Sequence, residues 1–304
     1  MREKRNLVLG VVRGYSFEQL QPFVCSLEHT AFNGDLVLLW NSLSPETQKV
    51  LQSHGVKLVH FPYRGSGTLN SWSRFWPLLA PIVRLWPDSG LARKILKSIV
   101  HLMYVRFFVC RDFLVSNQEV YQNVLITDVR DVIFQADPFF GFKNGLMVFE
   151  EDARLPLAEE KMCNAPWVEE TFGPEALSQI GRYPILCAGT TIGDVPSMIH
   201  YLTLFEKLLC RVNKIANGGD QGIHNYLCRH IMKTKAVVSK NGDGPILTMV
   251  PSLKMGVDFS VSENGLVLNS NGSLVPVLHQ YDRYPDLAAS LIWKFVNGSP
   301  SHEG

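Results

Sequence analysis

The pattern of apolar and polar positions is clearest in the first 62 residues. Residues 7–12 form an apolar run ended by Gly14, as is typical of a buried strand, and residues 36–40 and 56–61 are expected to be the second and third strands. Between them, residues 17–27 have a helical pattern, and Ser44-Pro45-Glu46 is typical of a capped helix start. This alternation predicts an α/β fold with a mainly parallel central sheet.

The rest of the chain continues this pattern after one interruption. Residues 64–90 are rich in Gly, Ser, Pro and Trp, and residues 91–116 predict one long amphipathic helix. Further strands are expected at 123–127, 146–149 and 185–193, helices at 195–212 and from 218 onward, and short strands after 235. Since the sequence has no internal repeat and no long linker, we predict one domain over residues 1–304, with a helical insert at about 64–111.

Composition narrows the class of protein. The chain has 304 residues, of which 46% are hydrophobic, enough for a large core. A net charge of +1 argues against broad nucleic-acid binding, which needs a strong positive field. The six cysteines form no C-x-x-C pair and are expected to be buried, reduced thiols. No secretory signal and no apolar run of about 20 residues occurs, so we expect a cytoplasmic protein, with membrane association as an alternative.

The insert differs from the rest of the chain in charge. It has a single acid, Asp88, and eight basic residues: Arg64, Arg74, Arg84, Arg93, Lys94, Lys97, Arg106 and Arg111. Trp72, Trp76 and Trp86 lie among them. Aromatic and basic residues together suit a lipid–water interface or an acidic or glycan acceptor. The alternative is a structural insert that packs its tryptophans on the core.

Two acids directly follow one of the expected buried strands. Asp128 and Asp131 come just after residues 123–127, and ligands of open α/β sheets bind outside the carboxyl ends of the strands. Carboxylates at such a place hold Mg²⁺ or Mn²⁺, and the cation neutralises a diphosphate leaving group. The alternative is that the two acids cap a turn or pair with Arg130, and their spacing leaves this open.

The segment 127–139 resembles the Asp-x-Asp region of GT-A glycosyltransferases, especially relatives of glycosyltransferase family 8 such as glycogenin and bacterial galactosyltransferases. In these proteins an apolar strand, an acid pair, a second apolar run and Asp-Pro follow one another. Counting back from Asp137, Asp131 matches the second acid, whereas the first falls on Val129 and Asp128 lies one place earlier. The resemblance implies a GT-A-like, Rossmann-like nucleotide-diphospho-sugar transferase fold with a metal bound by Asp131 and Asp128.

Three other segments resemble the donor-binding parts of the same family. Residues 11–15 follow strand one, where the family places the nucleotide base, and 106–107 lie where it keeps an Arg that faces the donor. Residues 187–193 resemble its Asn-x-Gly turn beneath the sugar. The alternatives are ordinary packing at strand ends and an ion pair between Arg106 and Asp112. The resemblance implies donor contacts from Val12, Arg13, Tyr15, Arg106, Asp128, Gly189 and Thr190.

Two late segments complete the resemblance. Residues 219–225 resemble the Asp-Gln helix start of the family, which implies catalytic roles for Asp220 and Gln221. Residues 278–282 resemble a late strand that ends in a metal-binding His, which implies that His279 is a third metal ligand. Capping of the helix by Asp220 and a hydrogen-bonded His279 without metal are the alternatives. The acids at 150–152 are typical of a solvated edge, with an acceptor-facing carboxylate as the alternative.

These observations predict a metal-dependent glycosyltransferase that uses Mn²⁺ or Mg²⁺. It would move a sugar from a nucleoside-diphosphate-sugar donor to a hydroxyl of a glycan or lipid-linked acceptor, and the family 8 resemblance favours retention. One alternative is a non-catalytic sugar- or membrane-binding protein on a decayed transferase fold, which the displaced first acid supports. Another is a sugar nucleotidyltransferase, which needs a Gly-rich basic loop after strand one, and Arg13-Gly14 is a poor version of that loop.

Overall fold

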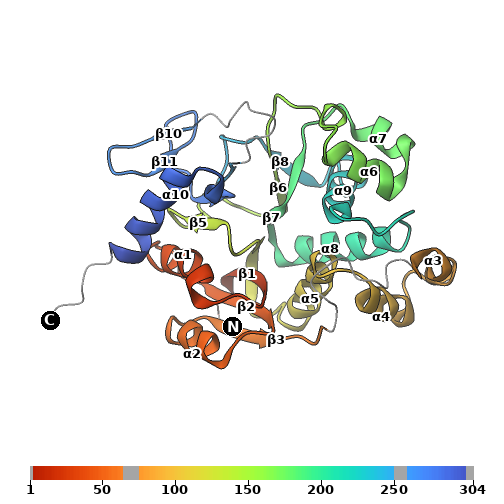
Figure 1. Cartoon of the computed structure of the whole chain (residues 1–304), viewed down its shortest axis with the longest axis horizontal. Helices are drawn as coiled ribbons and strands as arrows, with labels where there is room; N and C mark the ends of the chain where they lie inside the picture. The colour runs from red at the N-terminus through yellow and green to blue at the C-terminus, as the bar shows by residue number, and fades with distance from the viewer. Residues whose placement is uncertain (1–2, 64–74, 250–258, 299–304) are drawn as a thin grey trace.

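The computed structural model describes residues 3–63, 75–249 and 259–298. Its centre is a sheet formed by β1 (Arg5–Arg13), β2 (Asp35–Asn41), β3 (Lys57–His60), β4 (Tyr121–Thr127), β6 (Leu146–Glu150), β7 (Leu186–Asp194) and β8 (Ala236–Ser239). The strands lie in the order β3-β2-β1-β4-β7-β6-β8 (Figure 1). Those from β3 to β4 are parallel, β7 is antiparallel to β4 and β6, and β8 is parallel to β6. The predicted α/β fold with a mainly parallel central sheet is confirmed.

Helices cover both faces of this sheet, which explains the continuous apolar runs of its strands. Along β1, Leu7 and Leu9 belong to the core shared with α5 (Leu102–Ser116) and α8 (Val195–Leu209). Val8 and Val12 point to the opposite face, where they pack with α1 (Phe17–Glu28). The short helix α2 (Pro45–Ser53) begins at the predicted Ser44 cap, whose side chain accepts a hydrogen bond from the Thr47 N–H.

A second, three-stranded sheet joins the middle of the chain to its late part. It contains β5 (Val132–Phe134), β9 (Ile246–Thr248) and β12 (Val277–His279), in the order β5-β12-β9. A separate hairpin pairs β10 (Ser260–Val261) with β11 (Val267–Leu268). The helix α10 (Pro285–Ile292) and the turn Trp293–Asn297 then return to α1 (Figure 1). The small sheet therefore brings residue 131 and residue 279 to the same place.

The expected single helix at 91–116 is wrong, because two helices occupy this stretch. These are α4 (Gly90–Ile99) and α5, preceded by α3 (Trp76–Leu85). The helical conformation is interrupted at Val100, which has an extended backbone. His101 then caps α5 by accepting a hydrogen bond from the Met103 N–H. The remaining helices are α6 (Asn164–Phe172), α7 (Pro174–Ile180) and α9 (Gly219–Tyr226), of which α6 and α9 pack against each other.

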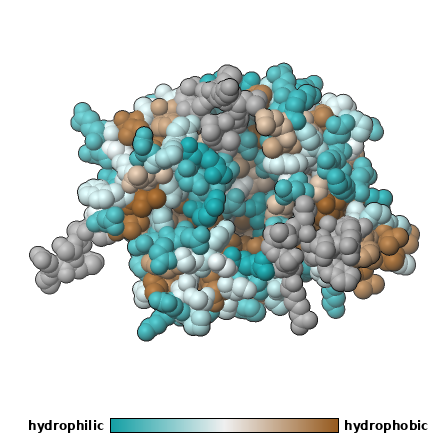
Figure 2. Space-filling view, viewed as in Figure 1, coloured by the Kyte–Doolittle hydropathy of each residue, from teal (hydrophilic) through white to brown (hydrophobic). Residues whose placement is uncertain are grey.

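The basic residues of the insert are largely paired inside the protein. Arg93 contacts Glu206 and Asp112, and Lys97 contacts Asp112 as well. Trp76 is buried and donates its indole N–H to a backbone carbonyl, whereas Trp86 is exposed. Residues Arg64, Trp72 and Arg74 lie outside the described part of the chain. The outer face of α3 and the residues after it remains apolar, seen as a brown patch in Figure 2, with Leu78, Leu85, Trp86 and Leu91 exposed. No helix in the described ranges is long and apolar enough to cross a membrane.

Candidate active site and metal centre

A cavity of about 660 Å³ lies where β4 and β12 end and β7 begins, near α5, α6 and α9. Six of the predicted site residues line it: Arg106, Asp128, Gly189, Asp220, Gln221 and His279. These residues are up to 173 positions apart in the sequence, from 106 to 279. The fold therefore brings short motifs that are far apart in the sequence together around one cavity.

The two acids and the histidine meet beside this cavity, which Asp128 and His279 line and Asp131 does not. Asp128 follows β4, Asp131 precedes β5, and His279 is the last residue of β12. One ligand atom from each of the three lies within 4.8 Å of the other two. The register explains this, because β12 pairs antiparallel with β5 and places His279 opposite Val132. The Gln280 N–H also donates to the Asp131 carbonyl at 2.6 Å.

The space between these side chains exists only because residue 189 is glycine. A Cβ at Gly189 would lie 2.6 Å from His279 Cε1 and 2.7 Å from both His279 Nε2 and Asp128 Oδ2. The Nε2 atom of His279 is buried, lies 3.7 Å from Asp128 Oδ2, and has no hydrogen-bond partner in the described part of the protein. Two carboxylates and an imidazole with an orphaned nitrogen fit a divalent first-row cation.

The electrostatic environment shifts the pKa values of Asp128 and Asp131 in opposite directions. Burial raises the pKa of Asp128, but Arg106 and His279 outweigh burial and leave this pKa below its ordinary value. Burial raises the pKa of Asp131, and the charges of Asp128 and Asp282 add to the effect, while His279 opposes it. Such a cluster gains from a bound cation, because the cation offsets the repulsion between neighbouring carboxylates.

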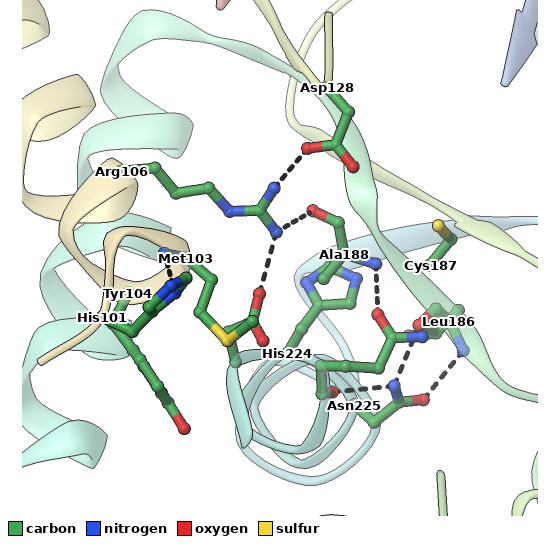
Figure 3. Close-up of polar contacts among 12 residues, drawn as sticks. His101, Met103, Tyr104, Arg106, Asp128, Leu186, Cys187, Ala188, His224 and Asn225 are labelled. Atoms are coloured by element: carbon green, nitrogen blue, oxygen red, sulfur yellow. Dashed lines mark hydrogen bonds and ion pairs between the residues drawn. The ribbon is translucent and has the colours of Figure 1, made fainter. Parts of the chain in front are cut away.

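Arg106 connects the acid cluster to the opposite wall (Figure 3). From α5 its guanidinium donates to Asp128 Oδ1 at 2.5 Å, to Asp220 Oδ2 at 3.0 Å and to the Ala188 carbonyl at 3.1 Å. The alternative pairing with Asp112 does not occur, since Asp112 contacts Arg93 and Lys97. Arg130, the other alternative partner of the acids, lies 3.7 Å from Asp282.

The helix α9 presents two adjacent polar side chains to the cavity. Its cap residue is Gly218, so Asp220 is not the cap and instead pairs with Arg106. Gln221 accepts a hydrogen bond from the Ala188 N–H at 2.8 Å and donates to Glu151 Oε1 at 2.8 Å. Both side chains are thus held in fixed orientations by partners on other elements.

The acids at 150–152 do not form a solvated edge, because all three are buried. Glu150 pairs with Arg229 at 2.8 Å, and Asp152 pairs with Arg154. Glu151 lines the cavity, and burial raises its pKa to about 7 despite the hydrogen bond from Gln221. The position of this residue after a strand is the signal behind the alternative of an acceptor-facing carboxylate, but its partner, 70 residues away, is not apparent from the sequence.

Four other predicted donor residues do not line the cavity. Val12 and Thr190 are fully buried. Arg13, at the end of β1, donates to Asn41 Oδ1 at 3.3 Å and lies over the Tyr63 ring. Tyr15 is half-buried, and its pKa is raised by burial, an effect that the Arg130 charge opposes and the Asp128 and Asp131 charges reinforce.

Known proteins similar to this chain were found by comparison of structure and not by comparison of sequence. No model of a protein family matches the sequence, and no curated protein matches it. Among solved structures, the chain is similar to the apo form of WbbM, a bifunctional glycosyltransferase (TM-score 0.48, 14% identity over 78% of this chain and 39% of that chain). It is also similar to the Mn/GDP form of core-mannan synthase A (CmsA/Ktr4) from Aspergillus fumigatus (TM-score 0.43, 14% identity over 78% of this chain and 73% of that chain). The chain thus spans well under half the length of WbbM, and neither similarity assigns a role to a residue.

Proposed function

We propose that this chain is a metal-dependent glycosyltransferase that moves a sugar from a nucleoside-diphosphate-sugar donor to a hydroxyl acceptor. The observation that carries the proposal is the meeting of Asp128, Asp131 and His279 at the edge of a cavity of about 660 Å³. Carboxylates at the carboxyl end of a strand, beside a cavity of this size, suit a phosphate-bearing ligand with its cation. Retention at the anomeric carbon is part of the proposal only through the family 8 resemblance.

In this proposal the three side chains hold Mn²⁺ or Mg²⁺. When bound, the cation supplies neutralising charge for the diphosphate leaving group. Arg106 positions Asp128, because their ion pair fixes the carboxylate next to His279. The glycine at 189 leaves room for the donor and the ion against β7. Arg13 and Tyr15 at the end of β1 are proposed to contact the nucleotide base, whereas the buried Val12 would only support them from the core, which leaves the cavity for the phosphates and sugar.

The opposite wall is proposed to orient the reacting sugar and the acceptor hydroxyl. Asp220 and Gln221 face the cavity, and Glu151 adds a third polar group beside them. Because Gln221 already bonds to Ala188 and Glu151, it acts as a rigid support that fixes the position of the Glu151 carboxyl. Asp220, paired with Arg106, keeps a carboxylate at the wall without an isolated buried charge.

The acceptor is proposed to be a glycan or a lipid-linked glycan. The exposed apolar side chains of α3 and the residues after it support a peripheral membrane contact, which a lipid-linked acceptor would need. Co-sedimentation with anionic and with neutral vesicles tests this contact. If the Leu78→Ser/Leu85→Ser variant co-sediments with vesicles as strongly as the wild type, α3 does not take part in the membrane contact.

The test of the main proposal is a screen of nucleoside-diphosphate sugars with Mn²⁺, read by thermal shift and followed by donor hydrolysis. A ligand that binds only the folded state raises the melting temperature. We expect one donor to stabilise the wild type, and Asp131→Ala to abolish both the shift and the turnover. Asp286→Ala, an exposed acid on α10, is the matched control and should behave as the wild type. Equal turnover in EDTA and in Mn²⁺ would refute metal dependence. Donor binding without turnover would instead support the sugar-binding alternative.

A further inference from the structure

A second group of metal-binding side chains lies on α1 and at the end of α2, outside the cavity described above. Cys25 and Glu28 are three residues apart on α1, so they share one face of the helix. His54, the residue after α2, places its Nδ1 3.0 Å from both carboxylate oxygens of Glu28. One ligand atom from each of the three residues lies within 4.8 Å of the other two. A thiol, a carboxylate and an imidazole therefore converge from two helices.

The surroundings of this group are apolar on one side and open on the other. Cys25 is 8% exposed, whereas the side chains of Glu28 and His54 are 42% and 30% exposed. The ring of Phe17 stacks on the His54 ring at 5.2 Å and orients it. A metal ion could thus reach the three side chains from solvent and keep one coordination position for a water molecule.

An ion pair between Glu28 and His54 accounts for two members of the group but not for the thiol. All six cysteines are free, and among the metal-binding groups of the described residues Cys25 is the cysteine whose Sγ lies within 4.8 Å of both a carboxylate and an imidazole ligand atom. Burial and the charge of Glu28 raise the Cys25 pKa, so the thiol keeps its proton at neutral pH. A bound metal ion would displace this proton, and binding would strengthen as the pH rises.

We propose that Cys25, Glu28 and His54 form a Zn²⁺ site separate from the site for the sugar donor. Sulfur, nitrogen and carboxylate ligands at about 2.0–2.3 Å are the set that Zn²⁺ prefers, and tetrahedral geometry places neighbouring ligand atoms about 3.5 Å apart. The three ligand atoms lie within 4.8 Å of one another, so binding would require them to approach by up to about 1.3 Å. Mg²⁺ and Ca²⁺ are disfavoured, because they bind oxygen ligands.

Such an ion would link α1 to the end of α2. Ser26, the neighbour of Cys25, accepts a hydrogen bond from the Phe134 N–H of β5 at 3.0 Å, and β5 directly follows Asp131. The proposed ion would therefore stabilise α1, the helix that contacts β5 beside Asp131. None of its three ligands lines the cavity, so the ion would lie outside the proposed donor site.

The experiment is a Co²⁺ titration of the full chain after treatment with a chelator, read by the thiolate-to-cobalt absorption band in the near ultraviolet. Cys187 provides the control, because its Sγ lies 3.5 Å from His279 Nδ1 in the other cluster. We expect the band in the wild type, in Cys187→Ser and in Asp131→Ala, and its loss in Cys25→Ser. His54→Ala should bind Co²⁺ roughly tenfold more weakly or worse, since even partners that only orient a metal ligand contribute this much. Zn²⁺ should bleach the band by competition.

Two results would overturn the proposal. One is the absence of the band in the wild type. The other is a band that Cys187→Ser removes and Cys25→Ser keeps, which would place the thiolate at the other cluster. Melting curves in EDTA show whether each variant folds. If Cys25→Ser does not, the exposed variants Glu28→Gln and His54→Ala decide the question in its place.

Discussion

Replacing Gly189 by alanine tests the proposed metal centre without removing any of its ligands. The added methyl group would lie 2.6 Å from His279 Cε1 and 2.7 Å from Asp128 Oδ2. Non-bonded carbon contacts are favourable at about 3.5–4.0 Å, so the ligand side chains must retreat by about 0.8 Å or more. Metal sites tolerate ligand displacements of only about 0.2 Å. We expect overpacking to cost about 1–3 kcal/mol of stability and Mn²⁺ affinity to fall by roughly tenfold or more, as for other disturbed metal sites.

The assay is Mn²⁺ binding measured by calorimetry, together with urea unfolding in EDTA to separate stability from affinity. Gly193→Ala is the matched control on the same strand. Its Cβ would meet the Gly145 carbonyl, Leu146 and Met198 at 3.2–3.4 Å, away from the metal ligands. This control should lose some stability and keep Mn²⁺ affinity. If Gly189→Ala folds and binds Mn²⁺ as tightly as the wild type, the three side chains do not hold the ion as inferred.

Three further predictions concern buried polar side chains. Because burial raises the Glu151 pKa to about 7, the folded state holds a proton that the unfolded chain releases at lower pH. The wild type should therefore lose up to about 3 kcal/mol relative to Glu151→Gln as the pH rises from 5 to 8, and a constant difference in urea midpoints in EDTA would contradict this. Arg229→Met leaves Glu150 buried without its partner and should cost about 3–5 kcal/mol in urea unfolding, whereas Arg229→Met/Glu150→Leu should recover most of this; equal losses in both would count against it. Asp220→Asn, which removes the carboxylate paired with Arg106, should lower donor turnover about 100-fold, and unchanged turnover would exclude Asp220 from the reaction.

The sequence pattern predicted the first two strands well because both of their faces are covered. β1 and β2 are apolar runs with core neighbours on each side, whereas β3, at the edge of the sheet, contains Lys57 and His60 and is largely exposed. The helix expected at 91–116 was wrong for a related reason. Apolar spacing continues through Val100 and His101, so periodicity alone does not reveal the extended backbone that separates α4 from α5. That break depends on the cap formed by His101, which is a local contact that hydropathy does not encode.

The candidate site was predictable where it follows strand ends, and not where it depends on distant pairs. Asp128 and Asp131 could be placed because the carboxyl ends of strands collect ligands. That Arg106 bridges Asp128 and Asp220 could not be derived, since the partners lie 22 and 114 residues away. Runs of neighbouring acids are usually solvated, so the pattern at 150–152 does not predict the burial of Glu151, whose partner on α9 is equally remote. The roles of these residues remain predictions.

The cluster of Asp128, Asp131 and His279 is formed by residues from two sheets, and this has a consequence for how the protein is synthesised. Asp128 follows a strand of the central sheet, whereas His279 ends a strand that pairs with β5 in the small sheet. During translation, Asp131 emerges 148 residues before His279. At about 5–20 residues per second, the delay is about 7–30 seconds. Throughout this interval β5 lacks its partner strand, and the nascent chain presents two carboxylates without the imidazole. If this cluster holds the proposed cation, loading would be a late event in biosynthesis, because it would wait for β12 to leave the ribosome.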